Sequence, residues 1–137
     1  MDLSNVDGKL LDRLVAEARG WRLVNYETYE PVVDDEERED AAYNDGWMWE
    51  GRPGDQEAWQ WEPHTSIAAA WELVEELYTD GWVLTVGTLA QVPRGWRVEM
   101  VHLHGHDLAQ HPTNIEANAD TAPTAICRAY LKAKEAQ

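Results

Sequence analysis

The sequence predicts an α/β sandwich of the α+β class, in which a mainly antiparallel sheet is covered by three helices. Amphipathic patterns mark three helical stretches along the 137 residues. Two of them are followed by glycine and tryptophan and then by a β-branched apolar run, at Gly20 and Gly81. Apolar runs then flank the turn at residues 92–95. We expect one domain over residues 1–137.

The first helix is expected to run from Ser4 or Asp7 to Arg19, with Asp12, Arg13 and Glu17 outside. Its predicted inner face comprises Val6, Leu10, Leu14, Val15 and Ala18. The first strand starts at Trp21. The second helix is predicted over residues 66–78, and its expected buried side chains are Ile67, Ala70, Trp71, Val74, Leu77 and Tyr78.

The rest of the sheet is predicted from a hairpin of residues 83–89 and 96–101, with a short strand over 114–119. The third helix closes the chain, because Asp120 or Thr121 can cap it and Pro123 suits its first turn. Cys127 is the single cysteine, so it forms no internal disulfide, and its place on the apolar side of this helix predicts a packing role.

Residues 26–63 form a long acidic insertion after the first strand. The insertion carries a charge of −11, whereas the rest of the chain carries −4. Such a surface repels nucleic acid and anionic membranes, so we expect neither as a direct partner, and it attracts a basic protein surface. The alternative is that the acids only keep a small protein soluble.

The second half of the insertion contains two tryptophan pairs at spacing two, Trp47 with Trp49 and Trp59 with Trp61, joined by a turn-rich link over 51–55. This spacing predicts a hairpin with each pair on one face of a strand. Three arrangements are then possible. The hairpin extends the main sheet and its indoles pack under a helix, the indoles form an exposed platform for a ligand, or the indoles lie in an oligomer interface. Residues 31–44 are predicted to be a mobile loop, or a segment that orders on contact with a partner.

Two segments carry a resemblance to a known family. The last helix reads DTAPTAICRAYL over residues 120–131, and the second helix reads TSIAAAWELVEEL over 65–77. Together they resemble the phage ABA sandwich domain family of small bacteriophage proteins. The resemblance implies the fold and a viral origin, and it supplies no established chemistry for particular residues.

Two histidine patterns are candidates for chemistry. His102, His104 and His106 share one face of an extended segment near Asp107 and His111, which suits zinc or nickel, but a polar strand end explains them as well.

His64 with Ser66, and His111 with Thr113, are similar to the paired motif of two-histidine phosphoesterases. Ser66 is better explained as a helix cap, and Pro112 is awkward in a strand. The sequence contains no P-loop and no GxGxxG. We therefore predict no catalytic residue, no metal and no cofactor.

These observations favour a phage-encoded, non-catalytic binding protein that counters host defence in the host bacterial cytoplasm. The preferred hypothesis is sequestration of a small nucleotide immune signal between tryptophans, with arginines on its phosphates. The expected ligand-binding residues are Trp47, Trp49, Trp59, Trp61, Arg94 and Arg97, with Arg52 as a further candidate.

The first alternative is an acidic inhibitor of a host defence protein that imitates the charge of nucleic acid. The second is a histidine-dependent phosphodiesterase acting on such a signal. A surplus of indoles, eight in all, further predicts a homo-oligomer.

Overall fold

The computed structural model describes residues 3, 6, 8–32, 34–41, 43–51, 58–89, 95–102 and 114–135. The described part contains four α-helices and five strands in two antiparallel sheets, which confirms the predicted α+β class. Contacts within the chain divide it into two units, which we call the N-terminal unit (residues 2–62) and the C-terminal unit (residues 63–137). The single domain over 1–137 stays a prediction.

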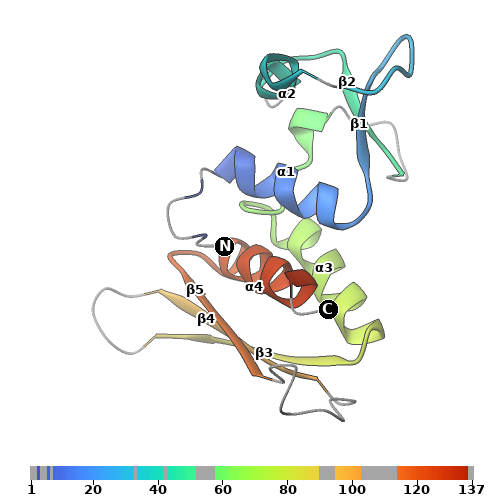
Figure 1. Ribbon diagram of the computed structural model, residues 1–137. Coiled ribbons are helices and arrows are strands. Elements are labelled where there is room, and N and C mark those ends of the chain that lie inside the picture. Colours follow the sequence, from blue (N-terminus) through green and yellow to red (C-terminus); the bar gives the residue numbers. More distant parts are fainter. Residues whose placement is uncertain are drawn as a thin grey trace. The chain divides into compact units, whose positions relative to one another are not determined.

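The C-terminal unit is built on a sheet of three antiparallel strands in the order β3 (Trp82–Thr88), β4 (Trp96–His102) and β5 (Asn114–Ala119). Helices α3 (Ile67–Thr79) and α4 (Ala122–Glu135) both pack on this sheet (Figure 1). The side chains of the covered face are buried, namely Trp82, Val98, Met100, Ile115 and Ala117. The predicted hairpin, short strand and closing helix are confirmed.

Helix α3 begins where Ser66 caps it, because the Ser66 hydroxyl accepts a hydrogen bond of 3.2 Å from the Ala69 N–H. Its buried side consists of Ala70, Leu73 and Leu77. The prediction was wrong for three other side chains, since Ile67 is 54% exposed, Trp71 51% and Tyr78 71%. The helix has two apolar faces, and both follow the helical period, so the spacing alone does not identify the face that meets the sheet.

Helix α4 is the more completely buried of the two described helices of this unit. Cys127 lies on its buried side, as predicted. Its basic side chains hold the neighbouring strand. Arg128 donates to the Asn118 carbonyl oxygen at 2.8 Å, and Lys132 donates to the Glu116 carbonyl oxygen at 2.7 Å. Lys134 forms an ion pair of 3.6 Å with Asp80.

The N-terminal unit contains a two-stranded antiparallel sheet of β1 (Arg22–Asn25) and β2 (Trp47–Glu50). The predicted tryptophan hairpin is therefore wrong. Trp49 lies opposite Leu23 of β1, and residues 58–60 form a 3₁₀ helix, η1 (Ala58–Gln60). Trp61 packs instead against Trp21, with ring centroids 4.8 Å apart. The apolar strand β1 offers β2 a ladder and a buried face, so β2 pairs there and not with the later tryptophans.

Two further predictions in this unit are corrected. Residues 31–44 contain helix α2 (Asp35–Ala41), whose Ala41 is buried. Helix α1 (Gly8–Ala18) buries Leu11, Asp12, Val15 and Ala16, so Asp12, expected outside, is only 5% exposed. The inner face is turned from the one predicted because Asp12 enters a pocket lined by the cations Lys9, Arg13 and Arg38.

The two tryptophans of the C-terminal unit with opposite exposure give a direct test of this packing. Trp82→Ala should lower the free energy of unfolding by about 3–5 kcal/mol, because it empties a buried site. Trp71→Ala should lower it by less than about 1 kcal/mol, because the indole is half exposed. Urea unfolding followed by circular dichroism measures both. Equal losses in the two variants would contradict the assignment of the buried face of α3.

Candidate functional site: an acidic surface with exposed tyrosines

Strand β1 is paired along both edges, and this fixes the segment that follows it. Beside the β2 ladder, the Val32 N–H donates to the Leu23 carbonyl oxygen at 3.0 Å, and the Asn25 N–H donates to the Glu30 carbonyl oxygen at 2.9 Å. The Asn25 side-chain oxygen accepts from the N–H groups of Glu27 and Thr28 at 2.9 and 3.2 Å. Residues 26–30 therefore form an ordered turn.

Three tyrosines are exposed around this turn. The exposed fractions are 44% for Tyr26, 64% for Tyr29 and 65% for Tyr43. The Tyr26 N–H donates to the Gly46 carbonyl oxygen at 2.8 Å, so the turn and the segment before β2 meet at the same end of the β1–β2 ladder. Exposed tyrosines on an ordered backbone are typical of protein-binding surfaces, since the ring supplies contact area at a small entropic cost.

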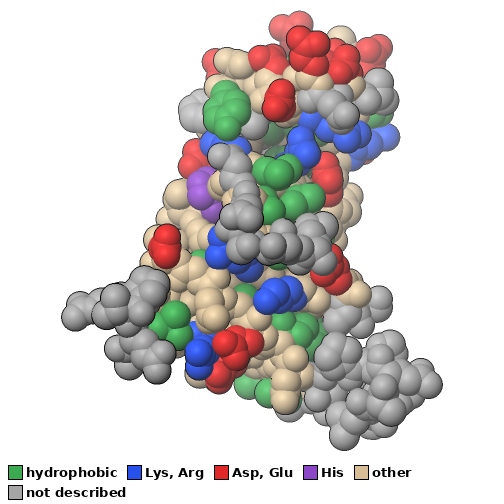
Figure 2. Space-filling model, turned by 60° about the vertical axis from the view of Figure 1, so that its left-hand side comes forward, with side chains coloured by type: hydrophobic (Ala, Val, Ile, Leu, Met, Phe, Trp, Pro, Cys, Tyr) green, Lys and Arg blue, Asp and Glu red, His purple; other side chains and the backbone are tan. Residues whose placement is uncertain are grey.

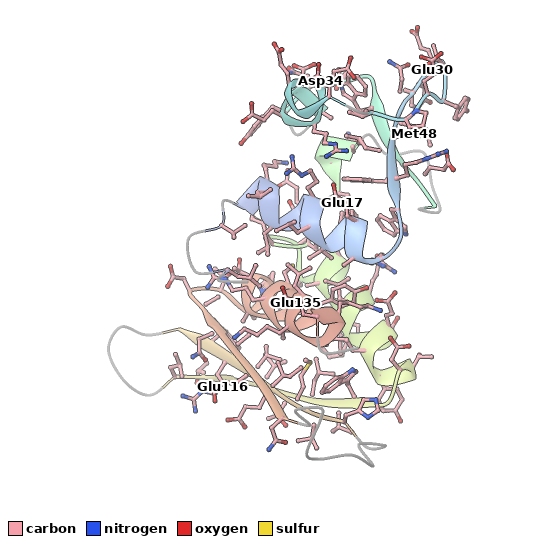
Figure 3. All side chains as sticks on the ribbon, in the orientation of Figure 1. Glu17, Glu30, Asp34, Met48, Glu116 and Glu135 are labelled. Atoms are coloured by element: carbon pink, nitrogen blue, oxygen red, sulfur yellow. The ribbon has the colours of Figure 1, made fainter. Side chains whose placement is uncertain are left out.

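Helix α2 adds a dense set of acids beside Tyr43. Asp34 caps the helix, because its side-chain oxygen accepts a 2.8 Å hydrogen bond from the Glu36 N–H. An open groove of about 720 Å³ runs along the helix, lined by Asp34, Glu36, Glu37, Glu39, Asp40, Tyr43 and Asn44. Figure 2 shows Asp and Glu side chains gathered over α2, and in Figure 3 the labelled Glu30 and Asp34 point outward.

We define the acidic–tyrosine surface as the exposed acids and tyrosines of residues 26–45. Its members are Tyr26, Glu27, Tyr29, Glu30, Asp34, Glu36, Glu37, Glu39, Asp40, Tyr43 and Asp45. Arg38 also belongs to α2, but it is half-buried and lines a pocket on the inner side. The helix thus presents carboxylates outward.

Four described cations of the N-terminal unit make contacts with residues outside the acidic–tyrosine surface. Lys9 pairs with Glu62 at 2.9 Å, and Arg22 makes two hydrogen bonds to Glu50 across the β1–β2 ladder. Arg13 lies 3.8 Å from Glu17. The Arg19 guanidinium stacks over the Trp21 ring at 4.5 Å. The acids in these ion pairs, Glu62, Glu50 and Glu17, all lie outside the acidic–tyrosine surface.

Tyr29 adopts a strained backbone conformation. Its φ angle is +58°, and among the described residues it is the one non-glycine residue with positive φ. A bulky L-residue in this region costs free energy, which the hydrogen bonds of the turn offset. The Tyr29 N–H, for instance, donates to the Asn25 carbonyl oxygen at 2.9 Å. The strain and the exposure make Tyr29 a candidate for a role in binding.

The predicted ligand-binding residues are only partly brought together. Trp49 and Trp61 are buried and line one pocket of the N-terminal unit, with Lys9, Asp12, Arg13 and Arg38 in its wall. The cavity volume is about 30 Å³, enough for a group of the size of one water. Trp47 is half-buried on β2, and for Trp59 the structure describes only its place in η1. As it stands, this pocket does not admit a nucleotide.

Of the arginines predicted for the phosphates, the structure describes Arg97 alone. Arg97 lies on β4 of the C-terminal unit, 3.2 Å from Glu116 and 3.7 Å from Glu99. Arg94 and Arg52 lie outside the described residues. The expected platform of four tryptophans with arginines therefore stays a prediction.

The histidine patterns are only partly within the described chain. His102 packs against Trp82 with ring centroids 4.8 Å apart, and its Nε2 lies 3.1 Å from the Asp80 carbonyl oxygen. His104, His106, Asp107 and His111 lie outside the described residues. Within the described ranges, no group of three or more His, Cys, Asp or Glu side chains is placed to hold a metal ion. Ser66 is a helix cap, as expected.

The fold and this surface define a small α+β protein with an acidic, tyrosine-bearing insertion and a sheet-and-helix frame. The Phage ABA sandwich domain model matches residues 19–131. The chain therefore belongs to the Phage ABA sandwich domain family, and it is a bacteriophage protein. Searches of curated proteins and of solved structures found no match to it. Among the described residues, no helix has the length and apolar character that crossing a membrane requires.

Sequence reasoning missed the three tyrosines of the surface. The signal was present, because Asn25 followed by Tyr-Glu-Thr-Tyr-Glu-Pro is a turn pattern. The side chains of a short loop project outward. The helix start was also present, as Asp34 followed by acids in the first turn favours an N-terminus. The charge density suggested disorder instead.

The strain at Tyr29 predicts an unusual stability change. Tyr29→Gly should raise the free energy of unfolding by about 0.5–1 kcal/mol, because glycine accepts positive φ and the exposed ring loses little packing. Tyr43→Gly is the control, since Tyr43 has no such backbone strain and its replacement should be neutral or destabilising. Urea unfolding compares them. Destabilisation by Tyr29→Gly as large as that by Tyr43→Gly would contradict the strained turn.

Proposed function

We propose that this phage protein acts in the host bacterial cytoplasm by binding a basic surface of a host defence protein through the acidic–tyrosine surface. The observation that carries the proposal is the juxtaposition of eight exposed acids with three exposed tyrosines on an ordered turn and helix. Binding to such a surface would block whatever the basic patch of the host protein contacts. The proposed activity is therefore inhibition by occupation, without catalysis.

Two physical effects support this mode of binding. Exposed carboxylates raise the association rate with a positively charged partner, and they repel nucleic acid and anionic membranes. Tyrosines then supply the desolvated contacts that hold the complex, as they do at the centres of many interfaces. The closely spaced acids of α2 also offer a line of negative charge, so a nucleic-acid-binding surface of the host protein is the favoured target.

Sequestration of a nucleotide signal is the second candidate. It is favoured by one observation, the pocket that places Trp49 and Trp61 beside Lys9, Arg13 and Arg38. Indoles and cations together suit a base and its phosphates. The pocket must open by many times its volume to admit such a ligand, and Arg38 and Ala41 of α2 form part of its wall. Nucleotide binding therefore requires α2 to move.

Capture from host lysate on the immobilised protein tests the first proposal. The test variant combines Glu36→Gln, Glu37→Gln and Glu39→Gln. It should retain at least about tenfold less of the host protein at about 0.15 M salt, while its thermal melt is preserved. The control variant combines Glu99→Gln, Glu116→Gln and Glu135→Gln, which change the net charge equally but lie in the C-terminal unit. This variant should still retain the host protein. Equal losses in both variants, or equal retention, would contradict a role for this particular surface.

The tyrosines separate specific binding from charge attraction. Tyr26→Ser with Tyr43→Ser should also release the same host protein, because the carboxylates alone give only salt-sensitive adhesion.

For the second candidate, the protein is incubated with defined cyclic and linear nucleotides, washed and heated. Recovery of unchanged nucleotide at one equivalent from the wild type would establish sequestration in place of the first proposal, and new products would establish an enzyme.

A further inference from the structure

Helix α3 carries an apolar face that the C-terminal unit does not bury. Ala70, Leu73 and Leu77 point into the core, whereas Ile67, Trp71 and Tyr78 are exposed and Val74 between them is half-buried. We call these four residues, Ile67, Trp71, Val74 and Tyr78, the α3 stripe. Single exposed apolar residues are ordinary, but three exposed residues and one half-buried residue along one line of a helix indicate a binding surface.

The spacing of the α3 stripe is that of a helix–helix contact. Its residues are separated by four, three and four positions, which is the spacing of the contact positions in a coiled coil. The stripe extends over about 16 Å, three turns of helix. A second helix laid along it would therefore meet an apolar residue at each turn, and the geometry favours a helix over an extended strand or a flat surface.

The charge beside the stripe indicates the character of this second helix. Glu75 is exposed at the position that flanks the stripe, where charge selects the partner in coiled coils. Among the described residues of the C-terminal unit there are eight acids and four cations. All four cations make contacts within the unit: Arg97 with Glu116, Arg128 with Asn118, Lys132 with Glu116 and Lys134 with Asp80. The partner must supply the positive charge.

We propose that the α3 stripe is a docking surface for a basic amphipathic helix of another protein. The inference goes beyond the proposed function, because it concerns the C-terminal unit and a different recognition chemistry. Apolar residues of the partner helix pack on Trp71 and Val74, while a lysine or arginine beside its apolar seam meets Glu75.

A second copy of this chain fits the stripe less well. When two identical helices pack antiparallel about a two-fold axis, the same flanking positions meet, so Glu75 would face Glu75 of the other copy. Each copy also carries a formal charge of −15, which opposes association. The same charge repels an anionic lipid surface.

The probe is a fluorescein-labelled synthetic helix of eighteen or so residues, with leucine at the contact positions and lysine at the flanking ones. Anisotropy titration should show binding to the wild-type protein, and Trp71→Ser should weaken it at least about tenfold. A peptide of the same composition in scrambled order should bind at least about tenfold more weakly. Val101→Ser removes an equally exposed apolar side chain from β4 and should leave binding unchanged.

The flanking charge is tested with a second peptide that has glutamate in place of lysine. Glu75→Lys should lower the preference for the lysine peptide about threefold or more, whereas Glu99→Lys, a matched reversal on β4, should leave it unchanged. Equal binding of the ordered and scrambled peptides would overturn the proposal, as would unchanged binding by Trp71→Ser with its melt preserved. A dimer by light scattering that Trp71→Ser converts to a monomer would assign the stripe to a second copy instead. None of these results depends on the acids of α2. The variant that combines Glu36→Gln, Glu37→Gln and Glu39→Gln should therefore still bind the ordered peptide more tightly than the scrambled one.

Discussion

The double pairing of β1 is the interaction on which the N-terminal unit depends. One edge of this four-residue strand forms the ladder with β2, and the other receives the returning segment at Pro31 and Val32. The first pairing buries Trp49 opposite Leu23, and the second closes the turn of residues 26–30. Because the chain returns along β1, helix α2 starts directly afterwards, with Asp34 as its cap and Ala41 as its buried anchor. A charge-dense segment is thus held in order by a short apolar strand.

The same arrangement decides where the negative charge can act. Arg22, Lys9 and Arg13 pair with Glu50, Glu62 and Glu17, and Arg38 turns inward from α2 to the pocket of Trp49 and Trp61. The carboxylates of α2 remain directed to solvent next to Tyr43. Repulsion among them lowers stability, so a role in binding gives a reason for a concentration of charge that folding does not need.

Sequence patterns predicted the C-terminal unit well, because its strands are regular, its turns carry clear signals, and Ser66 and Pro123 mark helix starts. They did not identify the inner face of α3, since the lines through Leu73 and through Trp71 are both apolar and only packing on the sheet chooses between them. In the insertion, spacing two correctly indicated a strand at Trp47 and Trp49, but it could not reveal that β1 is its partner. Trp59 and Trp61 share the same spacing without forming a strand. Asn25 signalled the turn that carries Tyr26 and Tyr29, but local composition does not encode the bond from the Tyr26 N–H to the Gly46 carbonyl oxygen, which joins residues far apart in the chain.

We infer that the acidic–tyrosine surface is ordered before any partner binds, and native-state amide hydrogen exchange of the free protein measures this order. The Asn25 N–H donates to the Glu30 carbonyl oxygen, and the N–H groups of Tyr29 and Val32 donate to the carbonyl oxygens of Asn25 and Leu23. In α2 the Arg38 N–H donates to the Asp34 carbonyl oxygen. We expect exchange at Asn25 and Val32 to be slowed at least about a hundredfold relative to an unstructured peptide, with measurable protection at Tyr29 and Arg38. Exchange at unstructured-peptide rates at all four positions, while the amides of β4 stay protected, would contradict it.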